Sequence, residues 1–211
     1  MRNFYKSLFS DALRNIVKNE KKIKKSIENQ DVKKQLFWLH MRRFISNAKA
    51  ILLLCEKKHN LEAVMLLRPM IELVVNLRWM VEDKTNQNIK KFFEDIDYEF
   101  DDYIPKMGDY WADADLLKRM KAIGFDEYYY KMVVKKLHEE LHCNPGVIAR
   151  SHHRNLTALN SEAIFATASQ FVGHLLKVGN DLYPHENFIN HTDIWSKIKY
   201  DKKHYNKRFN A

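Results

Sequence analysis

The sequence predicts an all-α fold, a helical bundle with two long N-terminal helices and a central apolar helix. Only five Gly and four Pro occur in 211 residues, too few for the turns of β-sandwiches and barrels or for glycine-looped nucleotide folds. Apolar side chains recur at helical spacing along most of the chain. A hydrophobic fraction of 45% and a charged fraction of 30% exclude a disordered chain. We therefore expect a single helical domain over residues 1–211.

The first two helices are predicted over residues 4–29 and from Asp31 to about His59. Asp31 suits a helix N-cap, and Lys57 and Lys58 place positive charge where a helix C-terminus favours it. The first helix is amphipathic, with apolar positions at Phe4, Leu8, Leu13, Ile16, Ile23 and Ile27.

The third helix, predicted over residues 61–82, is the most apolar segment and should lie at the centre of the bundle. Pro69 within it removes one backbone hydrogen bond and is expected to bend it.

Four further helices are predicted over residues 86–104, 113–122, 126–142 and from Thr157 or Ser161 to about Gly179. Gly124 and the run Asn144–Gly146 mark the breaks between them. Residues 185–211 are polar and only weakly periodic, and we interpret them as a C-terminal extension.

Charge is distributed unevenly along the chain. The net charge is +9, and residues 1–60 hold fifteen Lys and Arg against five Asp and Glu, whereas residues 61–104 hold five against ten. The basic end, including Lys24 and Lys25, would attract phosphates by counterion release. A solvated lysine-rich helix face explains the same composition.

Three polar residues follow one another at four-residue steps in the apolar third helix: Arg68, Glu72 and Asn76. This spacing places them on one stripe of the helix. One interpretation is an ion pair that fixes the packing of the helix. The other is a functional site, in which Arg and Glu hold an anion and a proton acceptor in fixed geometry.

The segment from His138 to His142 satisfies the His-Glu-x-x-His pattern of zinc peptidases, with Glu139 at the second position. Glu162 stands twenty residues after His142 and is a candidate third ligand, and His152 and His153 are other candidates. No strand is predicted ahead of His138, although zinc peptidases bind substrate along a sheet edge. A surface helix with two unligated histidines is the alternative.

A cationic cluster follows the break at Asn144–Gly146, and it contains Arg150, His153 and Arg154. Such a cluster could line a phosphate-binding cleft. An exposed loop of the same composition is the alternative.

Two stretches carry a resemblance to a known family. They are Leu67–Glu72 with Asn76–Asp83, and Leu141–Pro145. Together they resemble an uncharacterised family of bacterial all-helical proteins in which an Arg-x-x-x-Glu helix precedes an aromatic-rich helix and a later His stands just before a Pro turn. The resemblance covers roughly residues 35–180. That family is in turn distantly similar to the HEPN superfamily of helical-bundle proteins.

The HEPN resemblance implies a metal-independent endoribonuclease, a toxin or phage-defence effector acting on RNA without a cofactor. Arg68, Glu72 and His142 would be its catalytic residues. The neighbouring Asn76, the cluster Arg150, His153 and Arg154, and Lys24 and Lys25 would bind substrate. HEPN ribonucleases have an Arg followed by a His after four to six residues on one helix, and no Arg of this chain has a His at that spacing.

In the mechanism that the resemblance implies, the 2′-hydroxyl attacks the adjacent phosphorus. His142 would serve as acid or base and Arg68 would stabilise the phosphorane oxygens. The resemblance also implies a homodimer or other homo-oligomer.

The alternative to a ribonuclease is a non-catalytic helical module that binds RNA or a protein partner, such as an antitoxin or a sensor. Two cysteines and the lack of any membrane-spanning apolar run or export signal predict a cytoplasmic protein without membrane contact.

Overall fold

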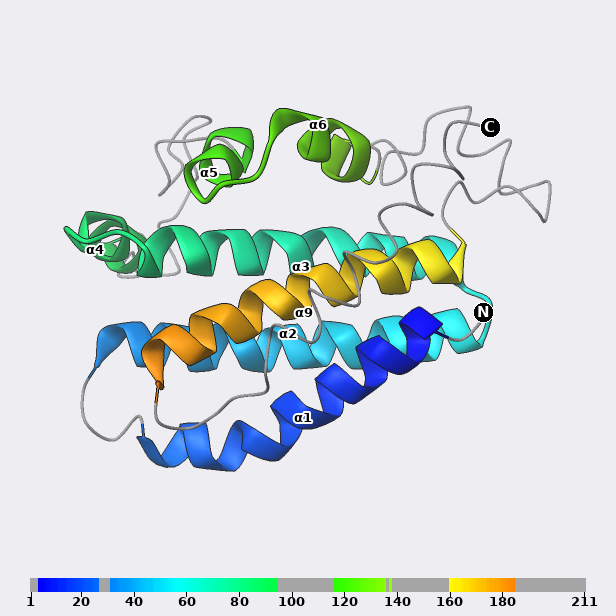
Figure 1. Cartoon of the computed structure of the whole chain (residues 1–211), viewed down its shortest axis with the longest axis horizontal. Coiled ribbons are helices and arrows are strands. Elements are labelled where there is room, and N and C mark those ends of the chain that lie inside the picture. Colours follow the sequence, from blue (N-terminus) through cyan, green and yellow to red (C-terminus); the bar gives the residue numbers. More distant parts are fainter. Residues whose placement is uncertain (1–3, 27–30, 95–115, 136, 138–159, 185–211) are drawn as a thin grey trace, which may run out of the picture.

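Four long helices form a bundle in the computed structural model (Figure 1): α1 (Phe4–Ser26), α2 (Val32–Glu56), α3 (Asn60–Val81) and α9 (Ser161–Leu182). The structure describes residues 4–26, 31–94, 116–135, 137 and 160–184. Across these residues the regular secondary structure is helical, without a strand. The predicted all-α bundle, with two long N-terminal helices and a central apolar one, is confirmed. The assignment of residues 1–211 to one domain stays a prediction.

The direction of α9 distinguishes this bundle from a simple up-and-down arrangement. Figure 1 shows α1, α3 and α9 running one way and α2 running the other. Helix α9 contacts α1 and α3 closely and α2 less extensively. A long connection after α3 therefore brings the chain back to start α9 at the same end as α3.

The core lies between these four helices. Each contributes side chains that are almost completely removed from solvent, including Phe9, Phe44, Leu67, Met70 and Phe171. Burial of each such side chain stabilises the fold by roughly 1.5–3 kcal/mol. Helix α3 buries apolar residues along nearly its whole length, which confirms its predicted central place.

The start of α2 agrees with the sequence prediction. The Asp31 carboxylate accepts hydrogen bonds from the backbone N–H groups of Lys33 at 2.9 Å and Lys34 at 3.4 Å, so the predicted N-cap is confirmed. The Lys33 ammonium donates to the carbonyls of Val81 at 3.0 Å and Asp83 at 3.2 Å. The start of α2 is thereby bonded to the end of α3, where positive charge is favourable.

Pro69 lies inside α3, and the helix continues on both sides of it. The ring takes away the hydrogen bond that the carbonyl of Met65 would otherwise receive. Both Pro69 and Met65 lie on the exposed side of the helix, where water can bind the freed carbonyl.

Two predictions about α9 are wrong. Asn160, rather than Thr157 or Ser161, is the N-cap and accepts a hydrogen bond from the Ala163 N–H at 2.9 Å. The helix also continues past Gly179 to Leu182. Gly179 does not end the helix. It allows α9 to pack closely against α2, because a Cβ at this position would lie 2.9 Å from Cζ of Phe37 on α2.

Shorter elements connect α3 to α9: α4 (Gln87–Glu94), α5 (Leu116–Ala122), α6 (Glu127–Tyr129) and the π-helical turn η2 (Tyr130–Lys135). In Figure 1, α5 and α6 lie along α3 on the side opposite α1. Gly124 has a φ of 86° and ends the α5 segment as predicted.

The prediction of a regular α-helix from Asp126 is wrong from Tyr130 onward, where the chain adopts the π-helical turn. Asp126 does cap the segment, as its carboxylate accepts from the Tyr129 N–H. Over six residues the apolar spacing of α- and π-helical turns is too similar to separate them from sequence. Parts of the predicted helices, residues 95–104, 113–115 and 138–142, lie outside the described residues.

Candidate functional site

The first two members of the predicted polar stripe, Arg68 and Glu72, form an ion pair along α3. Nε of Arg68 donates to Oε1 of Glu72 at 2.8 Å. Four residues correspond to about one helical turn, so the pairing needs no contribution from another element. The Arg68 side chain is 20% exposed and that of Glu72 is 37% exposed. The pair is therefore within reach of solvent.

The third member, Asn76, is bonded across to α5. Its side-chain Oδ1 accepts a hydrogen bond from Nη1 of Arg119. Arg119 was not among the residues singled out by the sequence, because its partner is 43 positions away. The stripe thus holds one guanidinium and one carboxylate, and α5 packs near its far end and adds the Arg119 guanidinium there.

A second Arg–Glu pair occupies the end of α3. Nε of Arg78 donates to Oε1 of Glu82 at 2.8 Å, and Nη2 of Arg78 lies 2.8 Å from the same oxygen. The Arg78 side chain is only 7% exposed, whereas Glu82 retains 37%. Nη1 of Arg78 lies 3.1 Å from Nδ1 of His174 on α9. Because a guanidinium can only donate, Nδ1 accepts and the imidazole proton is on Nε2.

His174 is held neutral by its surroundings. The Phe125 ring lies 4.6 Å from the imidazole, centroid to centroid, and Phe171 packs at 5.9 Å. Burial disfavours the charged imidazolium, and the nearby Arg78 guanidinium adds repulsion, which together lower the pKa of His174 to about 3. His174 therefore acts as a hydrogen-bond acceptor toward Arg78 at neutral pH.

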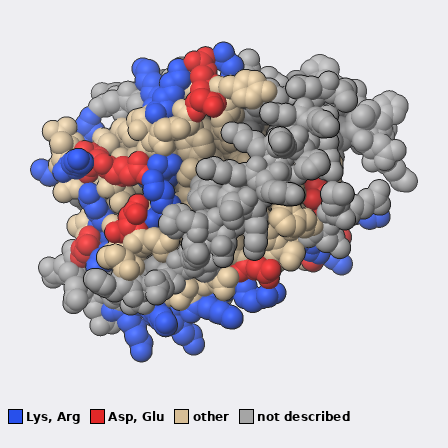
Figure 2. Space-filling view, in the orientation of Figure 1, with Lys and Arg blue, Asp and Glu red and all other residues tan. Residues whose placement is uncertain are grey.

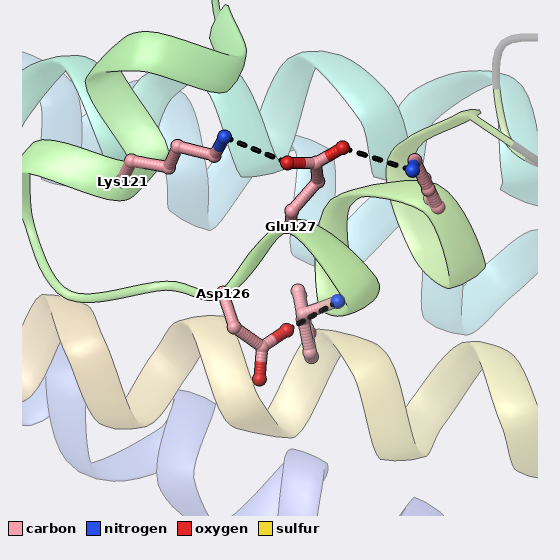
Figure 3. Close-up of polar contacts among 5 residues, drawn as sticks. Lys121, Asp126 and Glu127 are labelled. Carbon is pink, nitrogen blue, oxygen red and sulfur yellow. Dashed lines mark hydrogen bonds and ion pairs between the residues drawn. The ribbon is translucent and has the colours of Figure 1, made fainter.

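Helix α6 is attached to this region by polar contacts at both its ends (Figure 3). Asp126 caps it, and the Glu127 carboxylate lies 2.8 Å from the Lys121 ammonium of α5 and 2.8 Å from the Lys131 ammonium. Hydrogen bonds from Lys121 and Lys131 lower the pKa of Glu127 to about 2. The Tyr129 hydroxyl donates to Oε1 of Gln170 on α9, so the segment is tied to both α5 and α9.

Several predicted site residues lie outside the described residues: His138, His142, Arg150, His153 and Arg154. Their roles stay predictions. Glu162, the candidate third zinc ligand, lies in the first turn of α9 and is partly buried. Within the part of the chain that the structure describes, no three His, Cys, Asp or Glu side chains gather to form a metal site.

Helices α1 and α2 carry most of the exposed positive charge of the N-terminal half. Together they contain twelve Lys and Arg against three Asp and Glu. We call the exposed cations of these helices, apart from Arg14, which is paired with Asp11, the basic surface; it consists of Lys18, Lys21, Lys22, Lys24, Lys25, Arg42, Arg43 and Lys49. Figure 2 shows Lys and Arg side chains gathered along the edge of the molecule where α1 lies in Figure 1.

The two helices of the basic surface are linked at Arg42. Its Nε lies 3.7 Å from Oε1 of Glu20 on α1. Its guanidinium carbon lies over the Trp38 ring, 4.9 Å from the centroid. This cation–π contact holds an exposed guanidinium in a defined position between α1 and α2.

Sequence reasoning missed the Arg78–Glu82 pair and its contact with His174. The pair has the same four-residue spacing as Arg68 and Glu72, so a search for that spacing would have found it. His174 could not have been assigned to it, because 96 positions separate the two side chains.

Comparison with known proteins gives one match. Residues 34–99 match the Family of unknown function (DUF5677). The matched segment contains α3 and almost all of α2, together with α4, and therefore both Arg–Glu pairs. No curated protein and no solved structure matches the chain significantly. None of the described helices combines the length and apolar character needed to cross a membrane.

Proposed function

We propose that this protein binds RNA through the basic surface of α1 and α2. The observation that carries the proposal is the set of eight exposed cations on the outer faces of two adjacent helices, with Glu20 as the acidic residue that contacts them. Cations three and four residues apart on α1 follow one side of the helix, so a single polyanion can contact several of them at once. Each phosphate that is neutralised releases counterions and contributes to affinity.

The polar stripe favours binding over catalysis as the primary function. Arg68 is paired with Glu72, and Asn76 is bonded to Arg119. Hydrogen bonds that hold these groups to one another must be exchanged before any of them can contact a phosphate. The lysines of the basic surface extend into solvent, so they can contact a phosphate without first exchanging such hydrogen bonds.

Fluorescence anisotropy with a labelled RNA oligonucleotide at several salt concentrations tests the proposal. The double variant Lys24→Glu/Lys25→Glu should weaken binding at least tenfold at low salt and reduce the salt dependence, because contacts to about two phosphates are lost. The matched control is Lys84→Glu/Lys90→Glu, which makes the same charge change at exposed residues in and just before α4. Equal effects of the two double variants would contradict a specific role for the basic surface.

Metal-independent RNA cleavage is the second candidate. The solvent-accessible Arg68–Glu72 pair and the HEPN resemblance support it. His142 would supply the acid or base, Arg68 the cation for the phosphorane, and Glu72 would orient them. A toxin or phage-defence role in the cytoplasm and a homodimer belong to this candidate, whereas an antitoxin or sensor partner belongs to the non-catalytic binding module.

Cleavage is tested with purified protein and total RNA, with and without EDTA, on a denaturing gel. Products that persist in EDTA and disappear in His142→Ala would support the ribonuclease. Products that EDTA abolishes would direct attention to His138, His142 and Glu162 as metal ligands. Absence of cleavage together with retained binding would leave RNA binding as the function.

A further inference from the structure

We propose that Trp38 and Arg42 form a base-stacking site, so that the basic surface binds single-stranded RNA in preference to duplex RNA. The inference rests on the proposed RNA binding and specifies the form of RNA that the surface takes. It is carried by the position of one guanidinium between an indole ring and solvent.

Arg42 differs from the other cations of the basic surface in being held in place. Its guanidinium carbon lies 4.9 Å from the centre of the Trp38 ring. Glu20 lies 3.7 Å from Nε, at one edge of the guanidinium. The side chain nevertheless remains 58% exposed. The guanidinium therefore lies over the indole ring, and solvent still reaches much of the side chain.

The indole supports this arrangement. Trp38 is partly buried, and its Nε1 atom is fully buried without a hydrogen-bond partner. The polar edge of the ring is thus directed into the protein, and the ring is available for contact with Arg42. Because the ring is fixed by packing, Arg42 loses little additional freedom when a ligand stacks on it.

The surroundings of Arg42 suit a nucleobase with its attached phosphates. Leu39, 53% exposed, lies three positions earlier on α2 and borders Arg42 with apolar surface. Lys21 and Lys22 follow Glu20 on α1, and Arg43 follows Arg42 on α2. A flat apolar base can stack on the guanidinium plane while these cations contact the flanking phosphates.

Stacking of this kind requires an unpaired base. In duplex RNA the bases are stacked on each other and the backbone is the accessible part, so a guanidinium plane has no base face to contact. Single strands expose their bases and lose little by stacking on the protein. The Trp38–Arg42 pair therefore predicts a preference for single strands that the lysines alone would not produce.

The test compares Arg42→Lys with Arg43→Lys in the full chain. Both variants retain the positive charge of an exposed arginine, but only the first removes a guanidinium held over an aromatic ring. Anisotropy is measured with a twelve-nucleotide oligouridine and with a hairpin duplex of equal charge whose loop is a non-nucleotide linker, so that it offers no unpaired base. We expect Arg42→Lys to weaken oligouridine binding about tenfold, Arg43→Lys to weaken it less than twofold, and neither to change hairpin binding more than twofold.

A second measurement reports stacking directly. An oligonucleotide containing the fluorescent base 2-aminopurine should be quenched by the wild-type protein and by Arg43→Lys, and much less by Arg42→Lys. Thermal unfolding of all three proteins checks that each is folded at the assay temperature.

The outcomes separate the inference from the proposed function. Equal effects of the two arginine variants, or tighter binding of the hairpin, would overturn base stacking while leaving RNA binding intact. Failure of the wild-type protein to bind either RNA would overturn both.

Discussion

Two Arg–Glu pairs on the same helix differ sharply in what surrounds them. Arg68–Glu72 and Arg78–Glu82 share the four-residue spacing and the 2.8 Å separation. The Arg68 side chain is 20% exposed, whereas Arg78 is 7% exposed and also bonds to His174 on α9. The first pair joins two turns of α3, and the second also connects α3 to α9.

This difference shows that spacing along a helix does not determine what an ion pair contributes. A solvent-accessible pair contributes little, since water stabilises either partner alone. A buried arginine whose partner is removed retains a charge that water cannot reach, and that is costly. We therefore expect Arg78–Glu82 to contribute more to the stability of the fold than Arg68–Glu72.

The largest expected effect is on stability when Glu82 is removed. Glu82→Ala should lower the free energy of unfolding by about 3 kcal/mol, because Arg78 loses its counter-ion in a buried position. The measurement is chemical denaturation followed by circular dichroism.

Glu72→Ala is the matched control for this variant, since Glu72 has the same 37% exposure as Glu82. It should cost about 1 kcal/mol or less. Similar losses of unfolding free energy in Glu82→Ala and Glu72→Ala would show that burial of the arginine does not change what the ion pair contributes to stability.

An intermediate effect is expected in the pH dependence of stability. The pKa of His174 is about 3 in the folded protein, against about 6.5 in the unfolded chain. Between these values the unfolded state binds the additional proton, so His174 contributes stability above pH 6.5 that is lost as pH falls toward 3. The expected slope is about 1 kcal/mol per pH unit.

Denaturation of the wild-type protein and His174→Gln from pH 7 to pH 4 measures this contribution. The difference in unfolding free energy between the two proteins should change with pH, because only the wild type carries the buried imidazole. A constant difference between wild type and His174→Gln would show that His174 titrates alike in both states.

A small, local effect is expected at the far end of the polar stripe. Asn76→Ala removes an acceptor for Arg119 and should lower the free energy of unfolding by about 1 kcal/mol, mainly by loosening α5. Amide hydrogen exchange should accelerate over residues 116–122 while residues 164–176 in α9 remain protected. Acceleration in both segments alike would indicate that α5 is not attached independently.

The sequence predicted the long helices well and their ends less reliably. Asp31 was identified as a cap because its hydrogen bonds are local, to Lys33 and Lys34. Gly179 was misread as a helix end, because its role depends on Phe37 in another helix. At the site, Arg68 and Glu72 were recognised as neighbours from spacing, but Arg119 and His174 could be assigned to Asn76 and Arg78 only in the folded chain.

The sequence by itself determined the helical class, the apolar character of α3 and the excess of positive charge on α1 and α2. These properties follow from composition and from a repeat of 3.6 residues, which act within one helix. Tertiary structure alone decided that α9 lies between α1 and α3, that Arg78 is buried against His174, and that Arg42 meets Glu20 on another helix. Burial and contact between distant segments depend on how helices pack, and packing joins residues that no local pattern relates.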